Sequence, residues 1–255
     1  MSAIVIGIGT VMILYWISQI IFFVLHKRWS SITVSTESID TNSPVSVIHP
    51  IKDLDFELYK NLQSWTAQDY SGEIEHIFSF QDNNDKAIPV VSDFIKNYPS
   101  LKATIIINNP ITGINGKSSN MIHGIKISKY ENLLFVDSDI RVHKNFIQKM
   151  IRPLSKKNTG ATTCGQVNSG GNKFWTRFFT YLQNNETDFI WAYLTKIGIP
   201  MGITGAAFAM KKETIKKVGG LESYGDSLLE DFHLGHKLTE MGYKLILGPF
   251  IRCHV

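Results

Sequence analysis

Two aspartates, Asp137 and Asp139, follow directly after the apolar run 133–136 in the stretch NLLFVDSDIRV. Carboxylates at this spacing suit Mg²⁺ or Mn²⁺, hard cations that share their coordination shell between protein oxygens, water and substrate phosphates. The alternative is that an aspartate caps a helix beginning near His143, but a cap accounts for at most one of the two carboxylates. The spacing therefore predicts that Asp137 and Asp139 hold a divalent metal ion.

Two further aspartates, Asp82 and Asp85, follow the alternating segment 73–80 in the sequence QDNND. Strand-like runs alternate along this half of the chain with helical patterns; the strands are expected at 45–50, 73–80, 103–108 and 133–136, and the helices at 53–66, 87–98 and 117–130. Such alternation is typical of an α/β fold in which helices cover both faces of a mostly parallel sheet. Ligands bind at the carboxyl ends of the strands in these sheets, so the four aspartates are predicted to meet at one edge.

A third acidic pair, Glu230-Asp231, begins a helical pattern over residues 227–242. The helix dipole favours negative charge in a first turn, so the pair is explained by capping alone. A carboxylate at this position can also act as a general base towards an alcohol. The residues by themselves leave both interpretations open.

An aromatic-rich stretch occupies residues 172–198. Two interpretations stay open here as well, a helix packed in the core or an amphipathic surface that lies on a membrane. The aromatic residues of this stretch are Phe174, Trp175, Phe178, Phe179, Tyr181, Phe189, Trp191 and Tyr193.

The first 29 residues resemble a membrane anchor. Residues 2–25 carry no charge and would span about 36 Å as a helix, enough to cross a hydrocarbon core of roughly 30 Å. Lys27, Arg28 and Trp29 follow, and the positive-inside tendency places them on the cytosolic side. We therefore expect a single-pass anchor over 1–29, a linker over 30–43 and a cytosolic domain over 44–255.

The composition excludes several function classes. The net charge is +4, and no basic run is interleaved with aromatic residues, so nucleic acid is not an expected partner. The two cysteines, Cys164 and Cys253, are too few for a disulfide framework and indicate buried thiols in a reducing compartment. The sequence NGKSS has the end of a phosphate-binding loop, but Ile111 stands where that loop requires glycine.

Several motifs, taken together, resemble family-21 glycosyltransferases, the family of ceramide glucosyltransferase and the bacterial hopanoid-associated glycosyltransferases. The resemblance covers residue 45 to the end and includes the preceding anchor. It is carried, in order and spacing, by VSVIHPIKD, FSFQDNNDKAI, GINGKSSN, YENLLFVDSDIRV and ITGAAFAMKKETIKKVGGLESYGDSLLEDF.

This resemblance implies a GT-A fold that binds a UDP-sugar. It places Asp82 near the uridine, with Asp85 of the same segment counted among the nucleotide-sugar-binding residues. It places Lys117 and Asn120 in the loop beside the nucleotide. Asp137 and Asp139 would form the element that holds Mn²⁺ or Mg²⁺ and the diphosphate, Asp137 serving both.

Asp231 in LLEDF matches the aspartate that acts as the base in that family. The implied reaction is an inverting transfer of glucose or N-acetylglucosamine from a UDP-sugar to the hydroxyl of a ceramide-like or hopanoid lipid in the bilayer. Family members continue with a Gln-x-x-Arg-Trp motif, and the sequence has no match to it. The alternative expectation is therefore a truncated, non-catalytic protein that binds the UDP-sugar.

Overall fold

The computed structural model describes residues 2–30, 42–107, 113–169, 173–184, 194, 202–227 and 229–254. The chain divides into two compact units, Met1–Ile39 and Asp40–Val255. All of the strands that are described belong to the second unit. Most of the expected linker over 30–43 lies outside the described residues.

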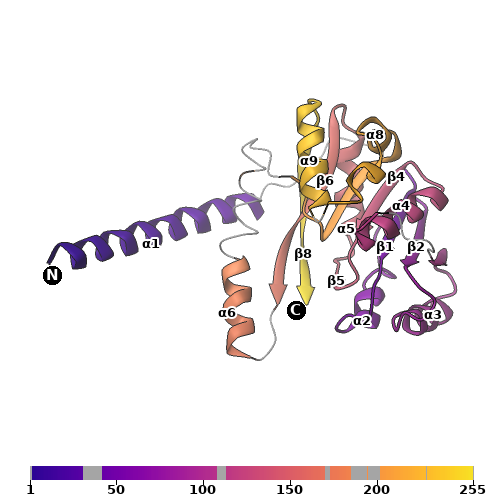
Figure 1. Ribbon diagram of the computed structural model, residues 1–255, viewed down its shortest axis with the longest axis horizontal. Coiled ribbons are helices and arrows are strands. Elements are labelled where there is room, and N and C mark those ends of the chain that lie inside the picture. Colours follow the sequence, from indigo (N-terminus) through magenta and orange to yellow (C-terminus); the bar gives the residue numbers. More distant parts are fainter. Residues whose placement is uncertain are drawn as a thin grey trace. The chain divides into compact units, whose positions relative to one another are not determined.

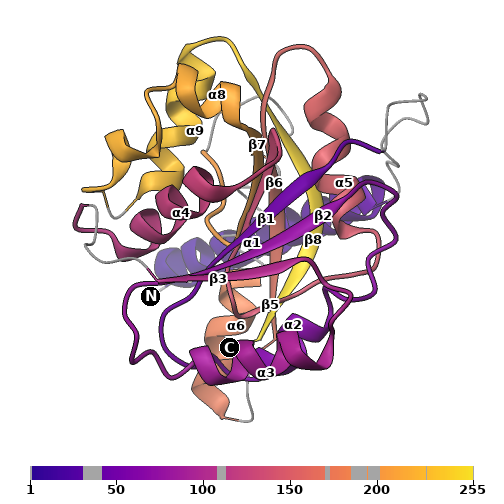
Figure 2. The ribbon, with the colours of Figure 1, turned by 90° about the vertical axis from the view of Figure 1, so that its right-hand side faces the viewer.

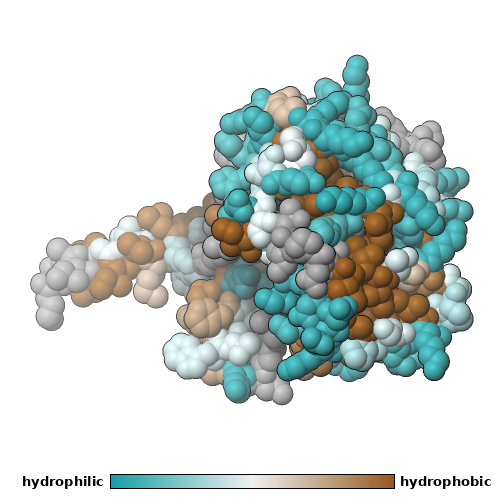
Figure 3. All heavy atoms as spheres, turned by 45° about the vertical axis from the view of Figure 1, so that its right-hand side comes forward, coloured by the Kyte–Doolittle hydropathy of each residue, from teal (hydrophilic) through white to brown (hydrophobic). Residues whose placement is uncertain are grey.

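The apolar N-terminal segment forms one helix, α1 (Ser2–Ser30). Its described side chains run from Val5 to Ile21 except for Gln19, and hydrophobic ones are exposed along this stretch (Figure 3). In the part of the chain that is described, no helix is long and apolar enough to cross a membrane, so the predicted span is not confirmed.

The second unit is built on one eight-stranded sheet with the strand order β3-β2-β1-β4-β7-β6-β8-β5. β1 pairs with β2 and β4 in parallel, β2 with β3 and β6 with β8 likewise, while β7 runs antiparallel to β4 and β6, and β5 antiparallel to β8. The expected parallel sheet is thus mostly parallel but mixed. The strands are β1 (Val45–Pro50), β2 (Ile74–Phe80), β3 (Ala103–Ile107), β4 (Asn132–Val136), β5 (Ile140–Arg141), β6 (Thr159–Ser169), β7 (Ala207–Lys211) and β8 (Lys244–His254).

Helices cover both faces of this sheet (Figures 1 and 2). One core packs the sheet against α4, α8 and α9, while two others pack it against α2, α3 and α5 on the opposite face. The helices are α2 (Leu58–Gln63), α3 (Ile88–Asn97), α4 (Gly116–Ile127), α5 (Phe146–Ile151), α6 (Phe174–Leu182), α8 (Lys212–Lys217) and α9 (Glu230–Glu240), with short 3₁₀ turns η1 (Arg152–Ser155) and η3 (Leu221–Tyr224).

The central strands β1 and β4 are completely buried, because helices cover both of their faces. Their carboxyl ends carry Pro50 and Val136, so the residues that follow emerge together at one edge of the sheet. The four predicted strands of the first half are therefore confirmed, with boundaries shifted by at most one residue.

The helix expected over 53–66 is much shorter than predicted. Asp53 and Glu57 have φ angles of 62° and 53°, in the left-handed region that interrupts a right-handed helix. α2 consequently begins only at Leu58. The apolar spacing of this segment gave no sign of either interruption.

Two buried histidines lie side by side on neighbouring strands, His49 on β1 and His76 on β2. Nε2 of His49 is 3.1 Å from Nδ1 of His76, and Trp65 packs edge-on against both rings. Burial lowers the pKa of His76 to about 4, and burial together with the charge of His76 lowers the pKa of His49 well below its ordinary value. Both rings are therefore neutral at pH 7.

Candidate functional site

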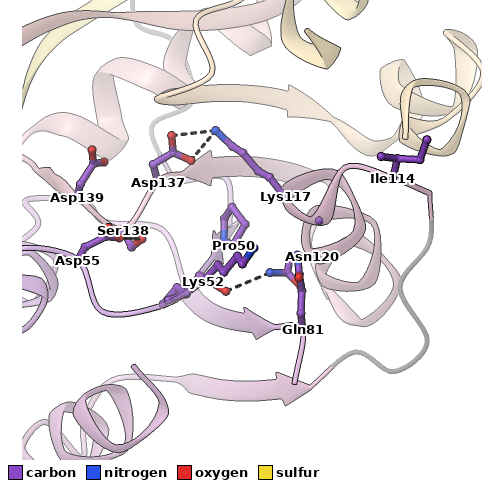
Figure 4. Close-up of a pocket in the computed structure, with 12 residues that line it drawn as sticks. Pro50, Lys52, Asp55, Gln81, Ile114, Lys117, Asn120, Asp137, Ser138 and Asp139 are labelled. Atoms are coloured by element: carbon purple, nitrogen blue, oxygen red, sulfur yellow. Dashed lines mark hydrogen bonds and ion pairs between the residues drawn. The ribbon is translucent and has the colours of Figure 1, made fainter. Parts of the chain in front are cut away.

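A pocket of about 440 Å³ opens at the edge where β1, β2 and β4 end (Figure 4). Three segments that follow these strands line it, together with the first turns of α4. The lining residues are Pro50, Ile51, Lys52, Asp55, Gln81, Ile114, Gly116, Lys117, Asn120, Asp137, Ser138 and Asp139.

An ion pair between Lys117 and Asp137 crosses this pocket. Nζ of Lys117 lies 2.6 Å from Oδ1 and 2.8 Å from Oδ2 of Asp137, and it also donates to the carbonyl oxygen of Gly205 at 2.7 Å. Both side chains are about 30% exposed. A lysine ammonium thus occupies the position beside Asp137 where a cation is expected.

The pKa values of the pair show how enclosed it is. Burial raises the pKa of Asp137 to about 6, because the opposing effect of Lys117 is smaller and the charges of Asp139 and Glu230 add to burial. Burial lowers the pKa of Lys117, but the charge and hydrogen bond of Asp137, followed by Glu230 and Asp231, outweigh burial and raise it. The site therefore carries more negative charge than Lys117 alone neutralises.

Asn115 holds Lys117 in place from the start of α4. Its side-chain oxygen accepts from the backbone N–H groups of Lys117 and Ser118 at 3.0 and 3.2 Å, which caps the helix. Its amide nitrogen donates to Oε2 of Glu230 at 2.7 Å and to the carbonyl oxygen of Ser227 at 2.9 Å. One asparagine therefore joins the first turns of α4 and α9.

Glu230 is buried, and burial raises the pKa of its carboxyl group above the ordinary value. Its hydrogen bond to Asn115 makes it a link between helices. The N-cap of α9, Leu229, offers no side-chain hydrogen bond to the first turn of the helix.

Asp231 points toward the ion pair from the first turn of α9. A Cβ atom on Gly205 would lie 2.6 Å from Oδ2 of Asp231 and 3.4 Å from Nζ of Lys117, so the carboxylate and the ammonium both approach this glycine closely. Oδ1 of Asp231 also accepts from the backbone N–H of Phe232 at 2.8 Å. The two interpretations of Asp231 are thus compatible, since one oxygen bonds its own helix and the other faces the site.

Asp139 lies on the same side of the pocket as Asp137 (Figure 4), and its charge raises the pKa of Asp137. Between them in sequence, Ser138 donates a hydrogen bond to Oδ2 of Asp55. Within the described ranges, no group of three or more His, Cys, Asp or Glu side chains is arranged to hold a metal ion. A metal here would take two carboxylates from the protein and its other ligands from elsewhere.

Asp82 and Asp85 do not line the pocket but shape the loop after β2. Oδ1 of Asp82 accepts from the backbone N–H of Asn84. The two oxygens of Asp85 accept from the backbone N–H groups of Ala87 and Asp53, at 2.8 and 2.9 Å. All four aspartates follow strands that end at this edge of the sheet, but of the four only Asp137 and Asp139 line the pocket.

Asn120 lines the pocket from helix α4 and donates to the carbonyl oxygen of Ile51 at 3.2 Å. Lys117 and Asn120 therefore belong to a helix and not to the loop that the resemblance implies. Four polar lining residues were not predicted from the sequence, namely Lys52, Asp55, Gln81 and Ser138. Each lies within five residues of the end of a buried strand. A position just after a buried strand could have identified these residues, but the prediction considered only aspartates at such positions.

Two kinds of comparison connect this chain with known proteins. A model of glycosyl transferase family 21 matches residues 9–252. Ceramide glucosyltransferase 1 of Caenorhabditis elegans is 30% identical over 250 residues, which cover 93% of this chain and 50% of that protein. Ceramide glucosyltransferase 3 of the same organism is 28% identical over 217 residues, covering 80% of this chain and 45% of that one. The chain spans about half the length of these relatives.

Solved structures share the fold at low sequence identity. A mannosyltransferase from Pyrobaculum calidifontis, in complex with GDP-Man and Mn²⁺, superposes with a TM-score of 0.58 at 19% identity, covering 95% of this chain and 65% of that one. GalNAc-T7, solved with UDP, GalNAc and Mn²⁺, gives 0.58 at 17% identity, covering 84% of this chain and 43% of that one. These likenesses show a glycosyltransferase fold of the GT-A type.

Proposed function

Because the chain belongs to glycosyl transferase family 21, we propose that it transfers a hexose from a UDP-sugar to a hydroxyl group of a membrane lipid. The observation that carries this proposal is that Asp231 and Lys117 both approach Gly205 beside the pocket, while Lys117 is paired with Asp137. A cation, a metal-binding carboxylate and a candidate base are the groups that such a transfer requires.

The pocket is the proposed donor site. Its volume of about 440 Å³ falls within the range of small-molecule sites, and it lies at the carboxyl ends of parallel strands, where nucleotides bind in such sheets. Lys117 and Asn120 would contact the nucleotide diphosphate from α4. Asp82 and Asp85 are proposed to act near the uridine from the loop after β2, where their carboxylates also accept hydrogen bonds from backbone N–H groups.

The residues present fit a divalent metal ion. Asp137 and Asp139 offer oxygen ligands, and Mg²⁺ or Mn²⁺ commonly takes one or two carboxylates from the protein and further ligands from water and substrate phosphates. Burial, followed by the charges of Asp139 and Glu230, raises the pKa of Asp137, and a cation bound between the carboxylates would favour their charged forms. A bound metal would neutralise the charge that develops on the leaving diphosphate. Both solved neighbours contain Mn²⁺, which supports this ion as the first to test.

Asp231 is the proposed general base. It would take the proton of the acceptor hydroxyl while the oxygen bonds to the anomeric carbon and the bond from that carbon to UDP breaks. Attack from the face opposite UDP inverts the configuration, so an α-linked donor gives a β-glycoside. Lys117 stays on the donor side, where its charge stabilises the departing diphosphate.

A lipid acceptor is proposed because the relatives are ceramide glucosyltransferases. Glucose and N-acetylglucosamine are the two candidate sugars, and a ceramide-like lipid or a hopanoid is the candidate acceptor. The exposed apolar side chains of α1 suit contact with a bilayer, and Lys27 and Arg28 after them favour a domain on the cytosolic side.

The test is UDP release by purified protein in detergent with Mn²⁺, from UDP-glucose or UDP-N-acetylglucosamine, with and without a membrane lipid extract. We expect the lipid to stimulate release, and Asp231→Asn to lower the stimulated rate by about 10²–10⁴-fold while UDP binding is retained. Asp93→Asn on α3, an exposed carboxylate outside the pocket lining, is the matched control and should leave the rate unchanged.

Two results would contradict the proposal in different ways. Metal-dependent UDP binding without any release would indicate the non-catalytic alternative, a protein that binds the donor only. Loss of UDP binding together with transfer in Asp231→Asn would assign Asp231 a structural role instead.

A further inference from the structure

Helix α6 presents its hydrophobic side to the surroundings instead of to the core. None of its residues is buried, although Phe174, Trp175 and Phe179 are among the largest side chains in the chain. These three are 71%, 67% and 64% exposed. The core-packing interpretation of this segment is therefore wrong for α6, while Phe189, Trp191 and Tyr193 lie outside the described residues.

The aromatic residues of α6 form one continuous face. At 100° per residue, positions 174, 175, 178, 179, 181 and 182 fall within one arc of about 160°. Their rings touch in sequence: Phe174 stacks on Phe178 at 6.4 Å between centroids, and Trp175 meets Phe178 edge-on at 6.1 Å. This face, from Phe174 to Leu182, is called the aromatic face below.

The opposite side of α6 is polar and faces the domain. Thr176, Thr180 and Asn184 recur every four residues, and all three are less exposed than their aromatic neighbours. Oδ1 of Asn184 accepts from the backbone N–H of Asn168 at 2.7 Å, and Nδ2 of Asn184 donates to the carbonyl oxygen of Asn168 at 2.8 Å. The helix is thus attached to β6 through its polar side, the reverse of an ordinary surface helix.

The charge and composition of α6 match a lipid surface. Lys173 and Arg177 are its only charged residues, and the helix with its N-cap contains no acid. Trp, Tyr and Phe on one side with cations beside them are typical of helices that lie in the interface of a bilayer, and the cations are attracted by anionic headgroups. Exposure of such an aromatic face to water does not stabilise the protein.

The position of α6 agrees with this partner. β6 runs parallel to β4, because β7 is antiparallel to both, so β6 ends at the same edge of the sheet as the pocket. α6 lies beside the end of β6 in both views (Figures 1 and 2). A bilayer in contact with the aromatic face would adjoin the edge that carries the pocket.

We propose that α6 is a membrane-docking helix whose aromatic face enters the surface of an anionic bilayer. The proposal requires neither sugar transfer nor a particular acceptor lipid. It can therefore fail while the proposed function holds, and the reverse is also possible.

The test measures the depth of spin labels on the full chain in vesicles of phosphatidylcholine and phosphatidylglycerol. One variant carries the label on the aromatic face (Phe179→Cys), and the matched control carries it at the polar N-cap (Lys173→Cys). Both positions are exposed, so labelling should not disturb folding. Cys253 is replaced by serine, whereas Cys164 is buried and burial raises its thiol pKa to about 12, which keeps it unreactive.

We expect the label at position 179 to be accessible to oxygen and protected from a water-soluble nickel reagent, and the label at 173 to remain accessible to nickel. Equal nickel accessibility at both positions would overturn the proposal. Protection of position 179 from oxygen as well as nickel would also overturn it, because a protein contact excludes both reagents.

Discussion

A hydrogen bond from Asn115 to Glu230 joins the N-termini of helices α4 and α9, yet the first turns of these helices carry opposite charges. α4 starts with Lys117 and contains no acid there, whereas α9 starts with Glu230 and Asp231. Because the N-terminus of a helix is its positive end, the acids of α9 are favourable and the lysine of α4 is unfavourable, each by about 0.3–1 kcal/mol.

This difference shows which charged residues the helix dipole explains and which it does not. The acids of α9 would be acceptable for helix stability alone, which is why the sequence left two interpretations open. Lys117 opposes the dipole of its own helix, and three partners offset this cost: the cap at Asn115, the carboxylate of Asp137 and the carbonyl oxygen of Gly205. A local rule broken and compensated in this way is typical of functional sites.

Among the substitutions that test the comparison of α4 with α9, removal of Lys117 is expected to have the largest effect. If Lys117 binds the donor diphosphate as proposed, Lys117→Met removes a charge-assisted hydrogen bond worth about 1.5–3 kcal/mol, so UDP affinity with Mn²⁺ should fall about 10–100-fold in titration calorimetry. Lys60→Met, which removes an ion pair on the surface, is the control and should bind UDP normally. A gain in affinity would mean that Lys117 merely competes with the metal for Asp137.

Asn115 tests the connection between the two first turns. Asn115→Ala removes the cap of α4, worth about 1 kcal/mol, and leaves buried Glu230 without its 2.7 Å partner, so the free energy of unfolding should fall by about 2 kcal/mol or more. Urea denaturation measures this loss. Asn115→Ser keeps a capping oxygen but cannot donate to Glu230 in the same way, and should recover only part of the stability. Full recovery would show that the bond to Glu230 is unimportant.

The two buried histidines have a smaller effect, which makes folding stability depend on pH. This dependence sets the pH range in which the N-termini of α4 and α9 can be compared. The unfolded chain binds protons at His49 and His76 near pH 6.5, but the folded chain does so only at lower pH, about 4 for His76. The stability that the two neutral histidines contribute is therefore present above pH 6.5 and is lost as the pH drops towards 4, by about 1 kcal/mol at pH 5.5 for His76. The raised pKa of Asp137, about 6, acts in the opposite direction and offsets part of this loss. Urea midpoints at pH 7.5 and 5.5 measure the decrease.

Replacing both histidines by phenylalanine keeps the ring stacking and should abolish this dependence. If the double variant still lost the same stability at pH 5.5, the response would come from other groups. Site titrations in the wild-type chain are best made above pH 6.5.

The first half of the fold follows from its sequence because regular rules govern it. Buried strands such as 133–136 alternate with amphipathic helices, and parallel pairing then places Asp137 at the pocket edge. Asp231 belongs to a helix whose position depends on contacts far along the chain, such as the close approach of Gly235 to Gly202. Its motif was recognisable, but its approach to Gly205 was not.

The second half follows less well from its pattern, for a physical reason. Hydrophobic periodicity shows that a helix has an apolar side but not what that side contacts. α9 buries Leu234 and Leu238 against the sheet, and α6 exposes Phe174 and Phe179. Asn184, just after α6, is bonded to Asn168 of β6, and an asparagine in a sequence does not indicate its partner.

A larger residue at Gly205 is expected to affect folding and catalysis differently. The atom that a methyl group at this position would meet is the end of the Asp231 side chain, which can rotate away at little cost to folding. Rotation would, however, carry the carboxylate away from Lys117. In a mutational library, position 205 should thus accept alanine when variants are selected for abundance and reject it when they are selected for turnover. The absence of a Cβ atom at this position is therefore a requirement of catalysis and not of folding.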